Sequence, residues 1–447
     1  MTLMQTRQAD EAIVSDAVQH ALDEAKRQGA TAADAGASLD SGLSVNVRMG
    51  EVETLEYHRG QGMAVTVYFG QRKGSASTSD LGGNAIVEAV AAACRIARFT
   101  SEDEFAGLAD AELMAREQPD LDLYHPWALD AEQAIEIARA CEAAGLALDP
   151  RITNSDGASV SAFDGVSAYA NTHGFLGVRA GSRHGLSCAL IAEDDQGMQR
   201  DYHYTNSRLP TELEAPERIG REAARRTVAR LSGRKLGTRK APILFTPELA
   251  RGLIGQFISA ISGGALYRRA TFLHGAIGEQ LFPAFVHLRE DPLIPRGLGS
   301  AAYDSEGVAT RPRDIVSDGI LRGYVLSSYS ARKLGMQTTA NAGGVHNLRI
   351  EPGAQGYDEL LRAMGTGLLV TELIGHGLNL VTGDYSRGAA GFWVENGEVQ
   401  YPVEEITIAG NLRDVFKGIV AVGNDLDTRG NIISGSLLIN EMMIAGD

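Results

Sequence analysis

The sequence predicts an α+β fold, with an N-terminal antiparallel sheet flanked by helices and a C-terminal strand-rich domain of mixed or antiparallel strands. Apolar residues recur at helical spacing in residues 9–28, whereas residues 35–79 alternate with a period of two. In the second half, the predicted strands outnumber the helices and few connections between strands are helical. That pattern disfavours a doubly wound parallel sheet.

The first half is expected to alternate helices with antiparallel strands. The helix at residues 9–28 ends at Gly29, and the strands of residues 35–79 are punctuated by glycines. Asp130 is the expected N-cap of a later helix and Gly145 its stop. The remaining predicted elements are a helix at 84–99, an acidic connector at 102–127, the helix at 130–144, short strands at 159–163, 166–171, 175–181 and 186–193, and a helix at 216–231. The arginines of the last helix are interpreted as a solvated face rather than as an anion-binding patch.

The second half begins after a predicted boundary at residues 232–240. Its expected helices are 247–262, 327–334, 357–364 and 411–419, and its expected strands are 242–245, 368–374, 389–395, 398–401, 405–409 and 432–440, with a hairpin at 315–325 and a strand approach at 341–350. A chain of 447 residues is too long for one ordinary core. We expect an N-terminal α+β domain at 1–110, a middle α+β segment at 111–235 packed against it, and the strand-rich domain at 236–447.

Composition limits the function classes. The net charge of −16 argues against a nucleic-acid binder, which needs a basic face. The three cysteines, Cys94, Cys141 and Cys188, form no CxxC pair, so we expect them to be buried and reduced. The sequence opens without an apolar leader segment, and no window reaches the roughly 18 apolar residues of a membrane helix. These features predict a cytoplasmic protein without a membrane partner.

A search for known catalytic motifs predicts no catalytic residue in this chain. The sequence contains no HExxH zinc motif, no GxSxG nucleophile elbow and no Walker loop. The closest histidine pairs, His173 with His184 and His274 with His287, do not share a helical turn. Neighbouring carboxylates are frequent, and in so acidic a chain we interpret them as solvated.

The glycine-rich stretch Thr366–Gly410 supplies the candidate substrate or partner surface. The candidate residues are His376, Gly383, Asp384, Tyr385, Ser386 and Arg387. Asp384 and Ser386 have an alternative role, because both residue types organise turns through side-chain to backbone hydrogen bonds. Arg387 is able to pair with Asp384 or to receive the carboxylate of a bound chain end.

Several segments resemble one protein family. They are GMAVTVYFGQRKGSASTSD, GGALYRRATFLHGAIGEQLF, the run TGLLVTELIGHGLNLVTGDYSRGAAGFWVENGEVQYPVEEITIAGNL, and IVAVGNDLDTRGNIISGSLLINEM. Together they resemble the TldE, or PmbA, members of the TldD/PmbA metalloprotease family, and the resemblance spans nearly the whole chain.

The resemblance implies a cytoplasmic heterodimeric protease that acts on small or unfolded peptides, in which a TldD-like partner carries an HExxxH helix and a C-terminal cysteine that bind zinc. The corresponding helix here, residues 248–262, has no histidine. Gln256 and Phe257 stand where His-Glu is expected, so Gln256 marks a degenerate metal-site position, and the SGSLLIN region has no cysteine. We therefore expect no cofactor in this chain and zinc in the partner, with this chain closing one side of a substrate chamber.

Two other functions stay open at this point. One is a self-sufficient peptidase that uses His376, Asp384 and Tyr385 at an unrecognised site. The other is a non-enzymatic regulator, in line with the family's older description as a modulator of DNA gyrase, although the sequence supports no direct contact with DNA. The sequence also leaves open whether the chain forms a homodimer when the partner is absent.

Overall fold

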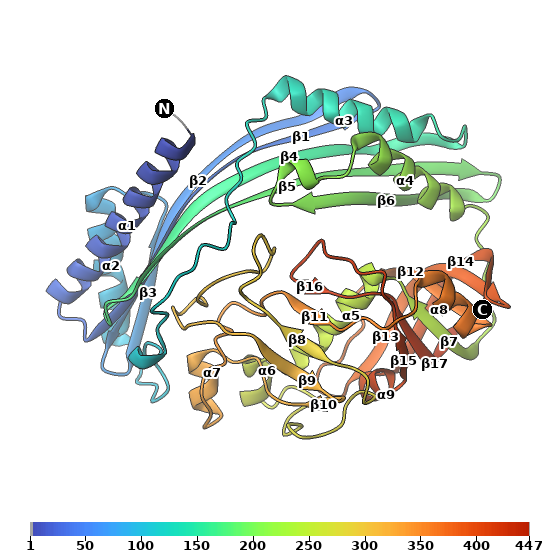
Figure 1. Ribbon diagram of the computed structural model, residues 1–447. Helices are drawn as coiled ribbons and strands as arrows, with labels where there is room; N and C mark the ends of the chain where they lie inside the picture. The colour runs from blue at the N-terminus through green and yellow to red at the C-terminus, as the bar shows by residue number, and fades with distance from the viewer. Residues whose placement is uncertain (1–2, 447) are drawn as a thin grey trace.

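A large curved sheet dominates the first half of the molecule and arches over the second half (Figure 1). The computed structural model describes residues 3–446. The strands of the curved sheet are β1 (Ala32–Arg48), β2 (Glu51–Phe69), β3 (Arg72–Thr78), β4 (Ile152–Asn171), β5 (Leu176–Asp194) and β6 (Gly197–Ser207). Their order is β3-β2-β1-β4-β5-β6, and every pairing is antiparallel.

The two faces of this sheet differ because side chains alternate along each strand. The convex face carries the apolar residues and is covered by two pairs of helices (Figure 1). One pair is α1 (Leu3–Arg27) with α2 (Gly83–Phe99), and the other is α3 (Ala131–Leu146) with α4 (Pro216–Ala229). The concave face carries many small and polar residues, together with aromatic rings such as that of Phe163, and looks toward the second half (Figure 1).

The contact between α3 and α4 explains one wrong prediction. Gly145, the expected helix stop, is instead the second-last residue of α3, and it is buried where α4 crosses closely. A Cβ atom at Gly220 of α4 would lie only 1.9 Å from the carbonyl oxygen of Cys141. Gly145 and Gly220 are therefore packing glycines. The N-cap prediction is confirmed, since Asp130 accepts a hydrogen bond from the backbone N–H of Gln133 in a capping box.

The second half contains two sheets around one apolar core. The six-stranded sheet has the order β14-β13-β12-β7-β17-β15, and the five-stranded sheet has the order β10-β9-β8-β11-β16. The strands are β7 (Arg239–Phe245), β8 (Leu288–Glu290), β9 (Arg313–Ser317), β10 (Ile320–Leu321), β11 (Leu348–Ile350), β12 (Gly367–Ile374), β13 (Asp384–Glu395), β14 (Glu398–Asn411), β15 (Ile419–Val422), β16 (Ile432–Ile433) and β17 (Leu437–Ala445). The β7–β12 and β11–β16 pairs are parallel and the others antiparallel, so the domain is mixed.

Short helices complete this half. They are α5 (Pro247–Ala260), α6 (Gly263–Tyr267), α7 (Ser328–Lys333), α8 (Tyr357–Met364) and α9 (Leu412–Lys417). Helix α5 packs into the core through Leu253, Ile254 and Phe257. Two short 3-10 turns, Ala111–Leu113 and Pro210–Glu212, lie in the first half.

The predicted α+β class is confirmed, and the main errors concern strand length. The four short strands expected between residues 159 and 193 are parts of two long strands, β4 and β5, and β6 was not predicted. The expected strands at 398–401 and 405–409 are a single strand, β14. All three cysteines are free and buried, as expected. No helix within residues 3–446 is long and apolar enough to cross a membrane.

The interpretation of the α4 arginines as a solvated face is wrong for Arg226 and Arg230. Arg226 pairs with Glu222 and with Glu248 of α5, and it keeps only 31% of its side-chain surface exposed. Arg230 is 13% exposed and pairs with Asp201 and Glu372. These arginines connect α4 to neighbouring elements instead of facing water.

Candidate functional site

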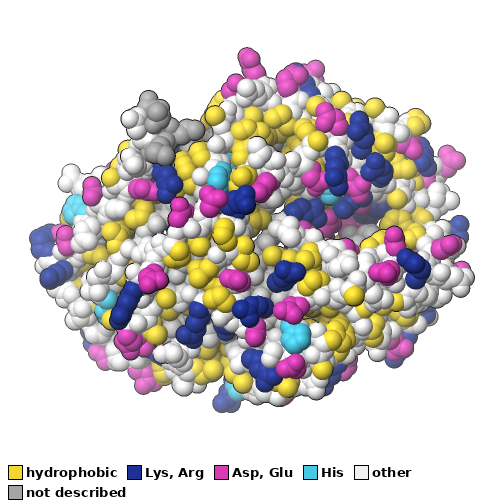
Figure 2. All heavy atoms as spheres, viewed as in Figure 1, with side chains coloured by type: hydrophobic (Ala, Val, Ile, Leu, Met, Phe, Trp, Pro, Cys, Tyr) yellow, Lys and Arg dark blue, Asp and Glu magenta, His cyan; other side chains and the backbone are white. Residues whose placement is uncertain are grey.

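A cleft of about 770 Å³ lies between the concave face of the curved sheet and loops of the second half. Strands β1, β2, β4 and β5 line one side, and residues 298–305 and 342–346 line the other. The molecule is hollowed along this line in the space-filling view, with basic and acidic side chains around the hollow (Figure 2).

The sheet side of the cleft contains a row of glycines. One row across the concave face joins Gly60 of β2, Asp40 of β1, Gly165 of β4 and Gly181 of β5. A Cβ atom at Gly165 would lie 2.4 Å from Oδ1 of Asp40. A Cβ atom at Gly181 would lie 3.2 Å from Nη1 of Arg208. Glycines here allow two charged side chains to lie directly against the sheet.

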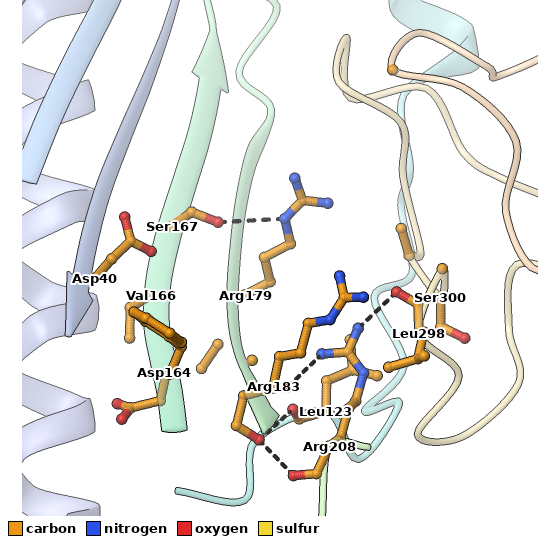
Figure 3. A pocket seen from close by; sticks show the side chains of 18 of the residues that line it. Asp40, Leu123, Asp164, Val166, Ser167, Arg179, Arg183, Arg208, Leu298 and Ser300 are labelled. Atoms are coloured by element: carbon orange, nitrogen blue, oxygen red, sulfur yellow. Dashed lines mark hydrogen bonds between the residues drawn. The ribbon is translucent and has the colours of Figure 1, made fainter. Parts of the chain in front are cut away.

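Three arginines project into the cleft from β5 and from the end of β6. Arg179 and Arg183 stand on the concave face of β5, and Arg208 follows the end of β6. Their guanidinium groups point toward the same space, and Asp40 lies on the opposite side of β4 in the close view (Figure 3). We call Arg179, Arg183 and Arg208 the arginine cluster.

Arg208 is the most firmly held member of the cluster. Its Nε, Nη1 and Nη2 groups donate to the carbonyl oxygens of Gly297, Ser182 and Leu298, each at 3.1 Å. Burial, with the positive charges of Arg183 and Arg179 nearby, lowers the pKa of Arg208. The three hydrogen bonds therefore fix the guanidinium group without neutralising its charge.

Arg183 and Arg179 are exposed and held only by neutral partners. Nε of Arg183 donates to Oδ1 of Asn206 at 3.2 Å. Nε of Arg179 donates to the hydroxyl of Ser167 at 3.4 Å, and its guanidinium lies 5.5 Å from the ring centroid of Tyr303. Among residues 3–446, no carboxylate lies within the 4.0 Å ion-pair distance of any arginine in the cluster.

Acidic residues line the part of the cleft formed by β1 and β2. Asp40 of β1 and Glu56 of β2 lie on the same concave face, next to His58. Loop residue Asp304 is also part of the lining, but it is buried and accepts hydrogen bonds from the backbone N–H groups of Glu306, Val308 and Ala342. Burial raises the pKa of Asp304 to about 6. Asp304 therefore shapes the loop, whereas Asp40 and Glu56 supply negative charge.

A second cavity of about 800 Å³ lies at the N-terminal end of α5. Glu248, in the first turn of α5, pairs with Arg226 of α4 and Arg429 of the C-terminal segment. Asp427 pairs with Arg429 at 2.9 Å and with Arg251 at 3.2 Å. Burial opposes ionisation of Glu248, but Arg226 and Arg429 outweigh it and lower the pKa of this carboxyl. In contrast to the arginine cluster, these arginines are neutralised by carboxylates.

The residues on α5 do not fit a zinc ion. Zinc sites in proteins use three or four donors from cysteine, histidine, aspartate or glutamate. Residues 3–446 contain no group of three such side chains placed to hold a metal. Oε1 of Gln256, at the predicted degenerate metal-site position, is buried and accepts no hydrogen bond. No step of a reaction is therefore assigned to a metal in this chain.

The glycine-rich candidates lie apart from both cavities. His376, Asp384 and Ser386 are exposed, and none of them lines either cavity. The carboxylate of Asp384 accepts hydrogen bonds from the hydroxyl of Thr382 and from Nδ2 of Asn411, which lowers its pKa. These bonds hold the turn before β13.

The other candidates in this stretch, Tyr385, Gly383 and Arg387, make contacts within the fold. The ring of Tyr385 is only 2% exposed and lies in the core of the second half. Gly383 has a positive φ of 81° and is buried. Nη2 of Arg387 donates to the carbonyl oxygen of Leu373 at 3.3 Å. A surface role for this stretch therefore depends on His376, Asp384 and Ser386.

The arginine cluster was not predicted, although its signal is present in the sequence. In β5, glycine and arginine alternate on one face as Gly177, Arg179, Gly181, Arg183 and Gly185. Interpreting Gly181 as the end of a strand hid this alternation. Arg208 is separated from β5 in sequence, so its place in the cluster depends on the pairing of β5 with β6.

Three family models match successive parts of the chain. They describe PmbA/TldA metallopeptidase domain 1 at residues 33–97, the central domain at 124–231 and the C-terminal domain at 238–446. Together they cover most of the sequence.

Full-length relatives agree with these matches. The chain is 49% identical to Metalloprotease PmbA of Escherichia coli O157:H7, over 100% of this chain and 99% of the relative. It is 47% identical to a Metalloprotease PmbA homolog of Haemophilus influenzae, over 98% and 97% of the two chains.

Solved structures share the fold. A Bacteroides thetaiotaomicron protein described as a candidate modulator of DNA gyrase superposes with a TM-score of 0.92 at 28% identity, covering 97% of this chain and 98% of that one. TldE from Thermococcus kodakarensis superposes with a TM-score of 0.81 at 19% identity, covering 96% and 100%. The chain belongs to the PmbA/TldD metallopeptidase family.

Proposed function

We propose that this chain is the metal-free subunit of a cytoplasmic two-subunit metalloprotease that cleaves small or unfolded peptides. The observation that carries the proposal is the combination of a large charged cleft with an α5 helix that has no histidine or cysteine and takes part in no group of three zinc donors within residues 3–446. A family of metallopeptidases needs a metal-bearing site, and the helix that would hold it here carries Gln256, with its amide oxygen buried, at the expected ligand position. A TldD-like partner then supplies the zinc and the catalytic groups.

In this proposal, the cleft forms one wall of the substrate chamber. A flexible peptide is able to lie close to this wall, because the glycines of the row carry no side chain that would hold its backbone away from the sheet. The arginine cluster and the acidic residues Asp40 and Glu56 would orient such a peptide.

The open edge of β2 is the surface we assign to the partner. Residues 63–69 of β2 pair with β3, whereas residues 51–62 pair only with β1. Next to this unpaired backbone, Val52, Leu55 and Tyr57 are 39%, 40% and 70% exposed. An edge strand with exposed apolar side chains is a template for pairing with a second chain. We assign the edge to a TldD-like subunit of similar fold, which would add a strand there.

Reconstitution with the TldD-like protein of the same genome tests this function. The two chains are purified separately and together, and cleavage of an unfolded peptide is followed with and without a chelator. We expect chelator-sensitive cleavage only in the mixture, and loss of co-purification on Tyr57→Asp but not on the control Tyr202→Asp. Cleavage by this chain alone, with stoichiometric zinc bound to it, would overturn the proposal.

The gyrase-modulator description of the Bacteroides relative is the alternative. The net charge of −16 disfavours contact with the DNA backbone, so such a role would act through a protein. Recovery of gyrase, and no TldD-like chain, on the purified protein would favour this alternative.

A further inference from the structure

The arginine cluster brings three positive charges to one cavity, and within residues 3–446 none of the three forms an ion pair with a carboxylate. Elsewhere, partly buried arginines such as Arg226, Arg313 and Arg429 pair with carboxylates. In the cleft, Arg208 is bound only by backbone carbonyls, and Arg183 and Arg179 only by neutral side chains. Like charges brought together without a partner destabilise a fold, so their position at a cavity points to an external anion.

The donors that remain free suit a carboxylate. Arg208 uses three of its five N–H groups, and Arg183 uses only Nε. The terminal nitrogens of Arg183 thus stay available to form paired hydrogen bonds with the two oxygens of one carboxylate. The firm attachment of Arg208 means that little side-chain entropy is lost when an anion binds.

The acidic side of the cleft limits what kind of anion fits. Asp40 lies over Gly165, and Arg208 lies over Gly181. These two glycines face each other across the β4–β5 pair, so the carboxylate is close to the cluster. Glu56 adds a second negative charge on the same face. A polyanion such as a nucleic acid or a polyphosphate would meet these carboxylates, whereas a ligand with one negative group at one end would not.

We propose that Arg179, Arg183 and Arg208 form a subsite that binds a single carboxylate of a peptide lying on the row of glycines in the cleft. This inference rests on the proposed function for its ligand class, and it adds which chemical group of the peptide is recognised and where. The carboxylate comes from the peptide's C-terminus or from an aspartate or glutamate side chain.

Direct binding to the purified full chain, without any partner, tests the subsite. Isothermal titration calorimetry compares tetra-alanine as the free acid, the same peptide as its C-terminal amide, and an amide in which one alanine is replaced by glutamate. We expect the free acid to bind at least about tenfold more tightly than the plain amide, the size of a charge-assisted hydrogen bond. If the glutamate-containing amide binds like the free acid, the subsite also takes side-chain carboxylates.

Variants assign the effect to the cluster. Arg183→Gln and Arg179→Gln change exposed residues, so both variants should fold, and each should bring the free acid close to the affinity of the amide. Arg200→Gln is the matched control, because Arg200 lies on the neighbouring strand β6, lines none of the described cavities and is already paired with Asp156. It should leave the preference unchanged.

Three outcomes would overturn the inference. The first is that the free acid and the amide bind with equal affinity. The second is that Arg183→Gln and Arg200→Gln lose the preference for the free acid to the same extent. The third is that inorganic phosphate binds more tightly than the free acid. Failure here is distinguishable from failure of the proposed function. If the preference for the carboxylate is absent but the two-subunit mixture cleaves peptides, only the subsite is wrong. If the preference is present but the mixture does not cleave peptides, only the peptidase proposal is rejected.

Discussion

The pairing of Glu248 with two arginines predicts a measurable dependence of stability on one carboxylate. Glu248→Gln keeps the shape of the side chain and removes its charge. The carboxylate contacts Arg226 at 3.2 Å and also accepts a hydrogen bond from Arg429, and only 18% of its side chain is exposed. The substitution therefore weakens two charge-assisted contacts at the junction of α4, α5 and the C-terminal segment.

The size of the effect follows from what each arginine keeps. Breaking a fully buried ion pair costs about 3–5 kcal/mol. Here Arg226 retains Glu222 and Arg429 retains Asp427, so neither is left without a carboxylate. We expect a loss of about 2 kcal/mol in the free energy of unfolding, the value of a hydrogen bond between charged groups.

A matched control separates the ion pairs from the helix dipole. Glu132 occupies the same position in the first turn of α3 as Glu248 does in α5, and it is exposed. Glu132→Gln loses the favourable interaction of a negative charge with the helix N-terminus, about 0.3–1 kcal/mol, without losing arginine contacts. Urea unfolding followed by circular dichroism at pH 7 compares both variants with the wild type.

The dependence on pH has a definite sign. The folded-state pKa of Glu248 is below its ordinary value of 4.5, so its contribution is complete above that value and is lost as the pH falls through the folded pKa. The stability difference between wild type and Glu248→Gln should shrink from pH 5 to the lowest pH at which the protein stays folded. Equal effects of the two glutamine variants, or a difference that does not change with pH, would refute the reasoning.

Three further predictions concern packing, thiols and metal content. Gly220→Ala forces a Cβ atom to within 1.9 Å of the Cys141 carbonyl oxygen, so it should lower the free energy of unfolding by about 1–3 kcal/mol. Gly252→Ala, which has open space around it in α5, should raise the free energy of unfolding by about 1 kcal/mol. Equal effects of the two variants in urea unfolding would contradict this prediction. All three cysteines are buried, and burial raises the pKa of the Cys94 thiol. A thiol reagent should therefore modify the chain only in denaturant. Rapid modification in native buffer would count against the fold. After gel filtration from a zinc-containing buffer, elemental analysis should find far less than one zinc per chain, and a stoichiometric amount would reveal a site that the described residues do not form.

The fold class could be predicted from the sequence because periodicity is a local signal. Residues 63–69 alternate apolar with other residues in β2, and the apolar set faces α2 and α1 as that pattern requires. Strand length could not be predicted in the same way. The sequence predicts a strand boundary at Gly60 and a gap between the short strands 159–163 and 166–171, but Gly60 and Gly165 both lie within long strands on the concave face. A glycine inside a strand marks a close approach of another group, and here that group is Asp40 over Gly165.

The candidate site was harder to predict than the fold, because it depends on contacts between distant segments. Asp384 and Ser386 attract attention as polar residues among glycines, yet glycines also serve turns, and hydrogen bonds to Asp384 hold the turn before β13. The charged cleft instead joins residues of β1, β5 and the loops of the second half. Such pairings over more than one hundred residues leave no local pattern in a single sequence.

The two arginine groups of this chain show how structure separates stability from function. In the cavity beside α5, arginines and carboxylates meet within ion-pair distance and connect three segments, α4, α5 and the C-terminal segment. In the cleft, acids are also present, since Asp40 and Glu56 share the concave face with Arg183, but none of them pairs with it. If the cleft served only to hold the two halves together, neutralising those charges would stabilise it. Keeping them apart costs stability and leaves donors and acceptors free, which is the property expected if the cleft is the substrate-binding wall that we propose.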